Sequence, residues 1–380
     1  MSSFDARLDV LRGTPRPLPY NARTLGALNA NPGCDRRTLI DAAGIDKDAL
    51  AAHLGLPRPL RKSLLALKHG LAFEQRVIGH DGAELVRLLR EALGLTLPEV
   101  GYEDVNSVGS DEDRSTPQLR HAHTRSLVIS AATKLSPPRT LLNHPVLYLP
   151  VAGQRVYLEP DVVAFHHHGV FHIVEIKSFP LINGQTDPAK TAAALTQGAA
   201  YVLALRHLLQ EAGLPPEGVS DDVVLINPLN LTQHPTATPF NASKQIRSLS
   251  RHLDRLNRLP ELLDRILPDT TLDLAPGPDG TPTRPRSELT AALARLDPLY
   301  TPHCRHHCDL AVHCRNEART RNRIEALGTT VSEDIAGLDT TATALALTDG
   351  HIHPARDQED ITRALRHAHR LHTALQAGTA

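Results

Sequence analysis

Aromatic side chains are scarce in this sequence. Its 380 residues include six phenylalanines, six tyrosines and no tryptophan. Proteins that bind single-stranded nucleic acid by stacking use aromatic rings as the platform for successive bases. Base stacking is therefore not expected to be the main binding device of this chain.

Long apolar runs and an export signal are also lacking. No stretch approaches the roughly 18 consecutive apolar residues that a membrane-spanning helix requires. The N-terminal sequence MSSFDARLDVLRG has no basic head followed by an apolar stretch, as a secretory signal would have. These absences argue against a membrane protein and predict a cytoplasmic one.

Neither sign of charge dominates. The sequence has 41 basic and 42 acidic residues, which gives a formal net charge of −1. A nucleic-acid partner would therefore have to bind at local basic patches. A hydrophobic fraction of 41% excludes wholesale disorder, and the length predicts two or three folded units.

The order of apolar patterns predicts an α/β fold. Helical spacing over residues 61–95 is interrupted near Gly79, and three β-branched runs, at 145–153, 155–165 and 170–179, predict strands. The remaining expected elements are an acidic loop at 100–117, helices to about 135, at 188–212 and at 243–259, and a buried strand at 221–227. We expect five regions: a helical region at 1–60, an α/β core at 61–266, a Pro/Gly-rich connector at 267–286, a cysteine-bearing segment at 287–326 and a helical tail at 327–380.

Three charged residues fall on a predicted hairpin. If residues 158–179 fold back at 167–169, antiparallel pairing places Asp161 directly opposite Glu175. Lys177 lies two residues further along and shares the face of Glu175. Apolar flanks on both faces favour a buried sheet over a solvent-exposed hairpin. Because like charges opposed in this way repel, a divalent cation such as Mg²⁺ is expected to lie between them.

These residues resemble a nuclease signature. Pro160-Asp161 followed by Glu175-Ile176-Lys177 is similar to the PD-(D/E)xK motif, in which an aspartate and an acidic-x-lysine triplet come from adjacent strands. Matches to the RecB-type branch of that superfamily are Glu74 in HGLAFEQRV and the Gln-x-x-x-Tyr pair, Gln197 and Tyr201, in TQGAAYVLAL.

The resemblance implies both a fold and an activity. The fold is a restriction-endonuclease-like core, αβββαβ with a central mixed sheet, with helical additions at both ends. The activity is hydrolysis of DNA phosphodiester bonds. By resemblance, Mg²⁺ or Mn²⁺ would bind Glu74, Asp161, Glu175 and the carbonyl of Ile176. Lys177 would orient the attacking water, and Gln197 and Tyr201 would support the site.

The four cysteines are unevenly placed. Cys34 stands alone, whereas Cys304, Cys308 and Cys314 lie within eleven residues. Since disulfides are not expected in a cytoplasmic chain, the pattern predicts four ligands of one metal centre. It resembles the iron–sulfur RecB-type nucleases, which include AddB-type nucleases and those of CRISPR spacer acquisition, and implies a structural [4Fe–4S] cluster.

Zinc is the alternative metal. Three residues separate Cys304 from Cys308, where the resembled family has two, and four histidines are interspersed among the thiols: His303, His306, His307 and His313. Sulfur or mixed sulfur and nitrogen ligands also suit Zn²⁺.

Two stripes of basic residues have helical spacing and are candidate contacts to DNA phosphates. The first comprises Lys244, Arg247, Arg251, Arg255 and Arg258, and the second comprises Arg315, Arg319 and Arg323. The alternative interpretation is that each stripe is an ordinary solvated helix face.

The sequence thus predicts a metal-dependent deoxyribonuclease of DNA repair, recombination or anti-phage defence. Its expected partners are DNA and a helicase or other repair or defence proteins. Two alternatives belong to other classes. One is a non-catalytic DNA-binding or assembly subunit. The other is a protein-interaction module whose fold is stabilised by its zinc or iron–sulfur site, and in which the charged residues of the hairpin have no catalytic role.

Overall fold

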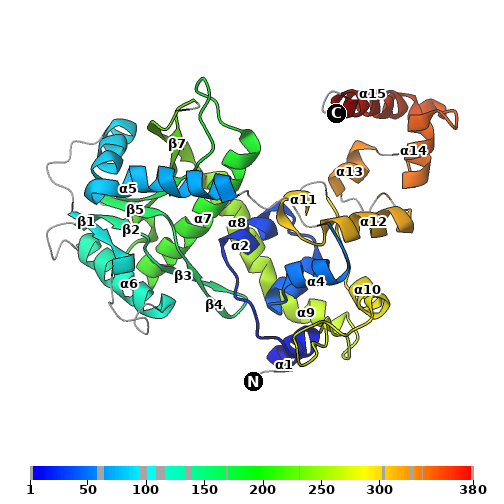
Figure 1. The fold of residues 1–380 in the computed structure, drawn as a ribbon, viewed down its shortest axis with the longest axis horizontal. Coiled ribbons are helices and arrows are strands. Elements are labelled where there is room, and N and C mark those ends of the chain that lie inside the picture. Colours follow the sequence, from blue (N-terminus) through cyan, green and yellow to red (C-terminus); the bar gives the residue numbers. More distant parts are fainter. Residues whose placement is uncertain are drawn as a thin grey trace. The chain divides into compact units, whose positions relative to one another are not determined.

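The structure is a computed structural model of a mixed α/β protein (Figure 1). It describes residues 3–57, 64–94, 101–107, 116–133, 139–167, 170–230, 232–301, 304–322, 324, 329–335 and 337–377. No helix within these ranges is both long and apolar enough to cross a membrane.

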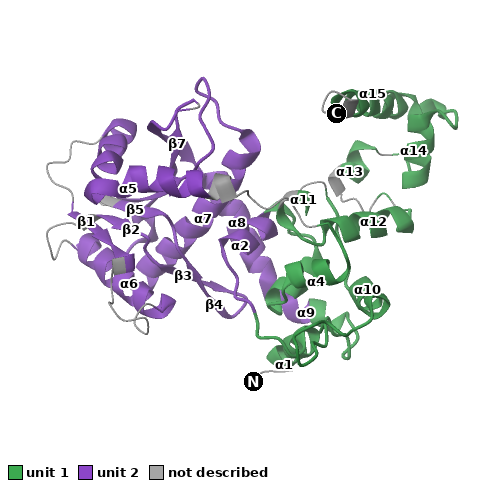
Figure 2. Cartoon of the chain, viewed as in Figure 1, with its two compact units in different colours: residues 1–17, 30–59, 262–380 green, residues 18–29, 60–261 purple. Residues whose placement is uncertain are grey.

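The chain divides into two compact units (Figure 2). Unit 2 comprises residues 18–29 and 60–261, and unit 1 comprises residues 1–17, 30–59 and 262–380. Unit 2 carries the strands, so it corresponds to the α/β core placed at 61–266 by the sequence. Unit 1 is helical and contains all four cysteines.

Unit 2 is built on a six-stranded mixed sheet with the order β1-β2-β5-β6-β7-β8. Its strands are β1 (Gly101–Asp104), β2 (Arg139–Asn143), β5 (Val162–His167), β6 (Val170–Ile176), β7 (Val219–Pro228) and β8 (Pro235–Asn241). The pairs β1–β2 and β6–β7 are parallel, and the other three are antiparallel. The expectation of a central mixed sheet is confirmed.

Two further strands form a separate hairpin. The strands β3 (Leu147–Val151) and β4 (Gln154–Leu158) pair only with each other. The run 155–165 had been predicted as one strand, and this is wrong: it breaks at residues 159–161, between β4 and β5. The break coincides with Pro160, which has no N–H for a sheet ladder.

Helices cover both faces of the large sheet. They are α5 (Leu64–Leu93), α6 (Pro117–Thr133), α7 (Pro188–Glu211) and α8 (Ser243–Arg255), with α2 (Ala22–Ala30) preceding them and α9 (Leu259–Asp264) following. Val224 of β7 packs in one apolar cluster with Val77 and Leu85 of α5. Its neighbour Val223 lies against Gly198 of α7. Because successive strand residues point to opposite faces, α5 and α7 lie on opposite sides of the sheet.

The interruption predicted near Gly79 is present in α5. Residues 79–82 leave the helical conformation, and His80, Asp81 and Gly82 have positive φ angles of 53°, 54° and 72°. Gly82 suits this bend, because glycine adopts positive φ without steric cost. The two halves of α5 thereby change direction and both contribute to the same core cluster.

Gly198 allows α7 to approach the sheet closely. A Cβ atom at this position would lie 2.8 Å from Val223 Cγ1, whereas one at Gly26 of α2 would meet nothing within 4 Å. We expect Gly198→Ala to lower the free energy of unfolding by about 1–3 kcal/mol through overpacking. Gly26→Ala, the matched helical control, should raise it by up to about 1 kcal/mol. Thermal melting of both variants measures this, and equal shifts would contradict close packing at Gly198.

The regular elements of unit 1 within its described ranges are helices. Its helices are α1 (Ser3–Arg12), α3 (Asp35–Ala42), α4 (Lys47–His53), α10 (Arg286–Ala294), α11 (Cys304–His307), α12 (Ala311–Arg321), α13 (Thr329–Asp334), α14 (Thr341–Asp349) and α15 (Glu359–Ala377). The expected connector is tied to the N-terminus, since Leu272 is buried and its N–H donates to the carbonyl of Leu11. The tail is helical and packs around Ile324, Leu338 and Leu347.

Candidate active site

Asp161 and Glu175 meet at one end of the β5–β6 hairpin. The two strands pair in the predicted register from Val162–Val174 to Ala164–His172 and shift between Ala164 and His167. The pairing brings Asp161, the residue before β5, to the end of β6. The N–H of Ile176 donates to Asp161 Oδ2 over 2.6 Å. Glu175 has no exposed surface, as the apolar flanks on both faces of the hairpin predicted.

Lys177 contacts both carboxylates. Its Nζ donates to Glu175 Oε2 over 2.5 Å and lies 3.8 Å from Asp161 Oδ2. On α7, Gln197 Oε1 accepts from Nζ over 3.3 Å, while Gln197 Nε2 donates to Tyr201 Oη over 2.7 Å. Gln197 and Tyr201 lie four residues apart and so share one face of the helix. The five side chains form one connected polar network.

Burial controls the protonation of this network. Removal from water raises the pKa of Glu175 to about 8, and the charge of Asp161 adds to the rise while Lys177 opposes it. Burial likewise raises the pKa of Asp161. Burial alone would lower the pKa of Lys177, but the two carboxylates outweigh it and raise that pKa. Together, Glu175, Asp161 and Lys177 therefore retain an extra proton near neutral pH. Binding of a divalent cation to the carboxylates would displace that proton.

One oxygen of the network is left without a hydrogen bond. Glu175 Oε1 is buried and has no partner among the described residues, a situation that costs about 1–3 kcal/mol. Carboxylate oxygens are the ligands that Mg²⁺ and Mn²⁺ prefer, so the donor chemistry fits such an ion. Within the described ranges, however, no three His, Cys, Asp or Glu side chains are arranged to hold a metal ion as they stand.

Glu74 reaches the site through a histidine that the sequence analysis missed. Glu74 on α5 has its Oε1 3.1 Å from Nε2 of His144, which follows β2. The backbone N–H of His144 donates to the carbonyl of Asp161 over 3.0 Å. The hydrogen bond to Glu74 raises the pKa of His144, with burial opposing and Asp104 adding to the rise. No local motif marks His144, because its partner lies 70 residues away.

The cysteines lie in unit 1 but do not form a ready metal site. Cys34, Cys304 and Cys314 are buried and Cys308 is half-buried, and none of the described groups of side chains is arranged to hold a metal. Burial raises the pKa of Cys308 to about 12, with Cys314 and Cys34 adding to the rise. Burial also raises the pKa of Cys314 to about 11.

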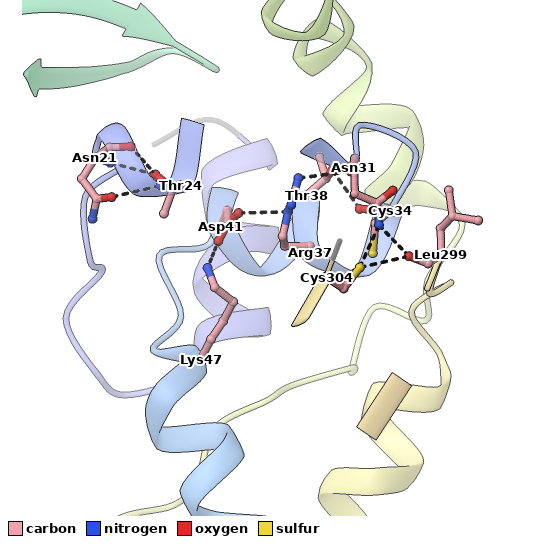
Figure 3. Close-up of polar contacts among 10 residues, drawn as sticks. All are labelled: Asn21, Thr24, Asn31, Cys34, Arg37, Thr38, Asp41, Lys47, Leu299 and Cys304. Atoms are coloured by element: carbon pink, nitrogen blue, oxygen red, sulfur yellow. Dashed lines mark hydrogen bonds and ion pairs between the residues drawn. The ribbon is translucent and has the colours of Figure 1, made fainter. Parts of the chain in front are cut away.

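Nitrogen donors face two of these sulfur atoms. Asn31 Nδ2 donates to Cys304 Sγ over 3.2 Å, and a chain of contacts runs back from Asn31 through Arg37 and Asp41 to Lys47 (Figure 3). In the same unit, Arg36 Nη1 donates to Cys314 Sγ over 3.3 Å and to Glu317 Oε2 over 2.6 Å. Arg36 is only 1% exposed. Such donors stabilise thiolates, so the chemistry of the segment suits a metal with sulfur ligands.

The predicted basic stripes lie on helices. On α8, Lys244, Arg247, Arg251, Arg255 and the following Arg258 are exposed, and Ile246 and Leu249 are buried on the other side. On α12, Arg319 is exposed and Arg315 is half-buried. His303 and Arg323 lie outside the described residues, as do residues 168–169 of the predicted turn.

Comparison of the chain with protein-family models and with curated proteins finds no match to either.

Proposed function

We propose that unit 2 is a divalent-metal-dependent deoxyribonuclease of the PD-(D/E)xK, RecB-type class, with a restriction-endonuclease-like core. The observation that carries the proposal is the fully buried Glu175, whose Oε1 has no partner among the described residues, beside Asp161 and Lys177. A structural role alone gives no reason to bury Glu175 beside a second carboxylate, because the buried charge loses its hydration.

The proposed roles follow from these contacts. Glu74, Asp161, Glu175 and the carbonyl of Ile176 would hold Mg²⁺ or Mn²⁺, which when bound supplies the charge that activates water and shields the leaving oxygen. Lys177 would position the attacking water and offset charge that develops on the phosphate. Gln197 holds Lys177 Nζ in place, and Tyr201 holds Gln197.

The remaining parts of the proposal concern binding. The exposed basic residues of α8 would contact DNA phosphates, as would Arg315 and Arg319 on α12, and such contacts supply affinity without base specificity. The four cysteines of unit 1 would hold a structural [4Fe–4S] cluster, with Zn²⁺ as the alternative. A helicase or other DNA-repair or defence proteins would be its partners.

The test is cleavage of linear single- and double-stranded DNA by anaerobically purified protein. Wild type should cut in Mn²⁺ or Mg²⁺ and stop cutting when a chelator is added. Asp161→Asn removes a charge that the cation needs, so its rate should fall by about 10²-fold or more. A folded wild type that binds DNA and never cuts would favour the non-catalytic DNA-binding subunit. Equal cutting by Asp161→Asn would place the activity elsewhere.

A further inference from the structure

His144 has an unusual backbone conformation that fixes its position at the site. Its φ angle is 48°, in the left-handed region that few residues other than glycine and asparagine adopt readily. Its N–H donates to the carbonyl of Asp161 over 3.0 Å. The strained residue is therefore anchored to the same segment that carries a proposed metal ligand, and strain of this kind persists only where surrounding contacts enforce it.

The ring of His144 contacts three elements. Asn143, at the end of β2, places its amide Nδ2 2.8 Å from Nδ1 of the ring. Asp104, at the end of β1, has Oδ1 3.5 Å from the same nitrogen. On the far side of the ring, Nε2 lies 3.1 Å from Glu74 Oε1 on α5.

The chemistry of Glu74 determines the direction of its hydrogen bond to His144. A carboxylate oxygen only accepts, so the hydrogen between the two groups belongs to Nε2 of the ring. Nε2 then donates to Glu74 Oε1. A carboxylate held through one oxygen keeps its second oxygen for another ligand.

We propose that His144 is a positioning residue, which holds Glu74 by Oε1 in the orientation needed to bind the divalent cation. The inference rests on the proposed function, since it assumes that Glu74 is a metal ligand. It assigns His144 no contact with substrate. Its effect is on the affinity for the cation, because a carboxylate free to rotate must be ordered on binding.

Two amide substitutions at His144 distinguish the role of Nε2 from that of Nδ1. In His144→Gln, the longer side chain places its Nε2 where the ring Nε2 lies and can still donate to Glu74. In His144→Asn, the shorter amide reaches only the Nδ1 position and loses Glu74. Asparagine also suits the left-handed backbone better than histidine does, so this variant should fold at least as well as wild type.

The experiment is calorimetric titration with Mn²⁺ of anaerobically purified protein that keeps the metal of unit 1 and has been dialysed free of Mg²⁺ and Mn²⁺, in parallel with thermal melting of the same samples before Mn²⁺ is added. We expect His144→Asn to bind Mn²⁺ about tenfold more weakly than wild type with no fall in melting temperature. His144→Gln should keep most of the affinity. His207→Gln is the control, because His207 lies on α7 beside another glutamate, Glu211, with 3.5 Å between Nε2 and Oε1, and is not part of the proposed metal site. The affinity of this variant for Mn²⁺ should equal that of wild type.

Each other outcome has a distinct meaning. If His144→Asn binds Mn²⁺ as tightly as wild type, His144 does not position Glu74 and the inference is overturned while the proposed function stands. If the Asn and Gln variants lose affinity equally, the contact through Nε2 is not the one that matters, and the inference is again overturned. If wild type does not bind Mn²⁺, or Asp161→Asn binds it equally well, the proposed metal site itself is wrong.

Discussion

Replacing Lys177 with methionine is expected to reduce the rate of DNA hydrolysis by about 10²- to 10³-fold, the usual effect of losing a preorganised positive charge at a reacting phosphate. Methionine keeps the volume of the aliphatic stem and removes the ammonium group that contacts Glu175 and Asp161. Lys190→Met is the matched control, because Lys190 also lies on unit 2 but its side chain is 60% exposed. It should cut DNA at the wild-type rate.

The same variant should show a pH-dependent loss of stability. Glu175 has its pKa raised from 4.5 to about 8 in the folded protein, so folding is favoured while Glu175 is protonated and is progressively disfavoured as the pH rises through that interval. Without Lys177, the buried Glu175 and the half-buried Asp161 repel with no cation between them. We expect the variant to lose about 3 kcal/mol relative to wild type above about pH 8, and little at about pH 5.

Thermal melting in chelator across this pH range measures the effect. Lys190→Met should follow wild type at every pH. If Lys177→Met loses the same stability at every pH, the cause would be poorer packing of the methionine side chain at position 177. That result would contradict the electrostatic account of the network while leaving the activity prediction to be judged separately.

The hairpin was predictable because its determinants are local. The two strands are close in sequence, and the register from Val162–Val174 to Ala164–His172 is the predicted one, although it shifts between Ala164 and His167. The complete burial of Glu175 followed from the apolar residues that flank it on both faces. The contact of Lys177 with Glu175 likewise follows from the two-residue period of a strand.

Three strands were missed for identifiable reasons. The segment of β8 reads PTATPFN, and its two prolines are unusual within a strand, yet β8 lies at an edge of the sheet, where proline is tolerated. The opposite edge strand, β1, reads GYED and lay within the predicted acidic loop. In β2, Leu141 and Leu142 are buried by pairing with β5, a contact that the five-residue segment does not reveal by itself.

The site was predictable only where a motif spans neighbouring strands or one helix face. Asp161, Glu175 and Lys177 satisfy that condition, as do Gln197 and Tyr201. His144 does not, because its place beside Glu74 depends on a left-handed backbone and on α5 packing against the sheet. Arg36 was missed for a similar reason, since a charged residue in a short helix gives no sign of being only 1% exposed.

Replacement of Cys34 by alanine is expected to remove the metal bound by unit 1 and to destabilise that unit. Cys34 precedes α3, and the other three thiols lie some 270 residues later in the sequence, so a shared metal would link two distant segments of one unit. Structural metal sites contribute on the order of 10 kcal/mol to folding when all ligands are present. Losing one of four ligands should therefore lower the melting temperature of anaerobically purified protein by far more than the loss of one buried side chain of this size.

Thr38→Val provides the control for that variant. Thr38 lies one helical turn after Cys34, and its Oγ1 donates to the carbonyl of Cys34 over 2.9 Å, so the substitution perturbs the same helix without touching a thiol. Thr38→Val should lower the free energy of unfolding by about 1 kcal/mol and leave the metal content unchanged.

Iron, sulfide and zinc are measured in wild type, Cys34→Ala and Thr38→Val, together with visible absorption. Iron with matching sulfide in wild type and in Thr38→Val but not in Cys34→Ala is the expected result. Zinc with the same pattern would identify the alternative metal, and a wild type with neither would contradict a metal centre in unit 1. Retention of the metal by Cys34→Ala would exclude Cys34 as a ligand, because four-thiolate sites rarely keep their metal when one sulfur is lost.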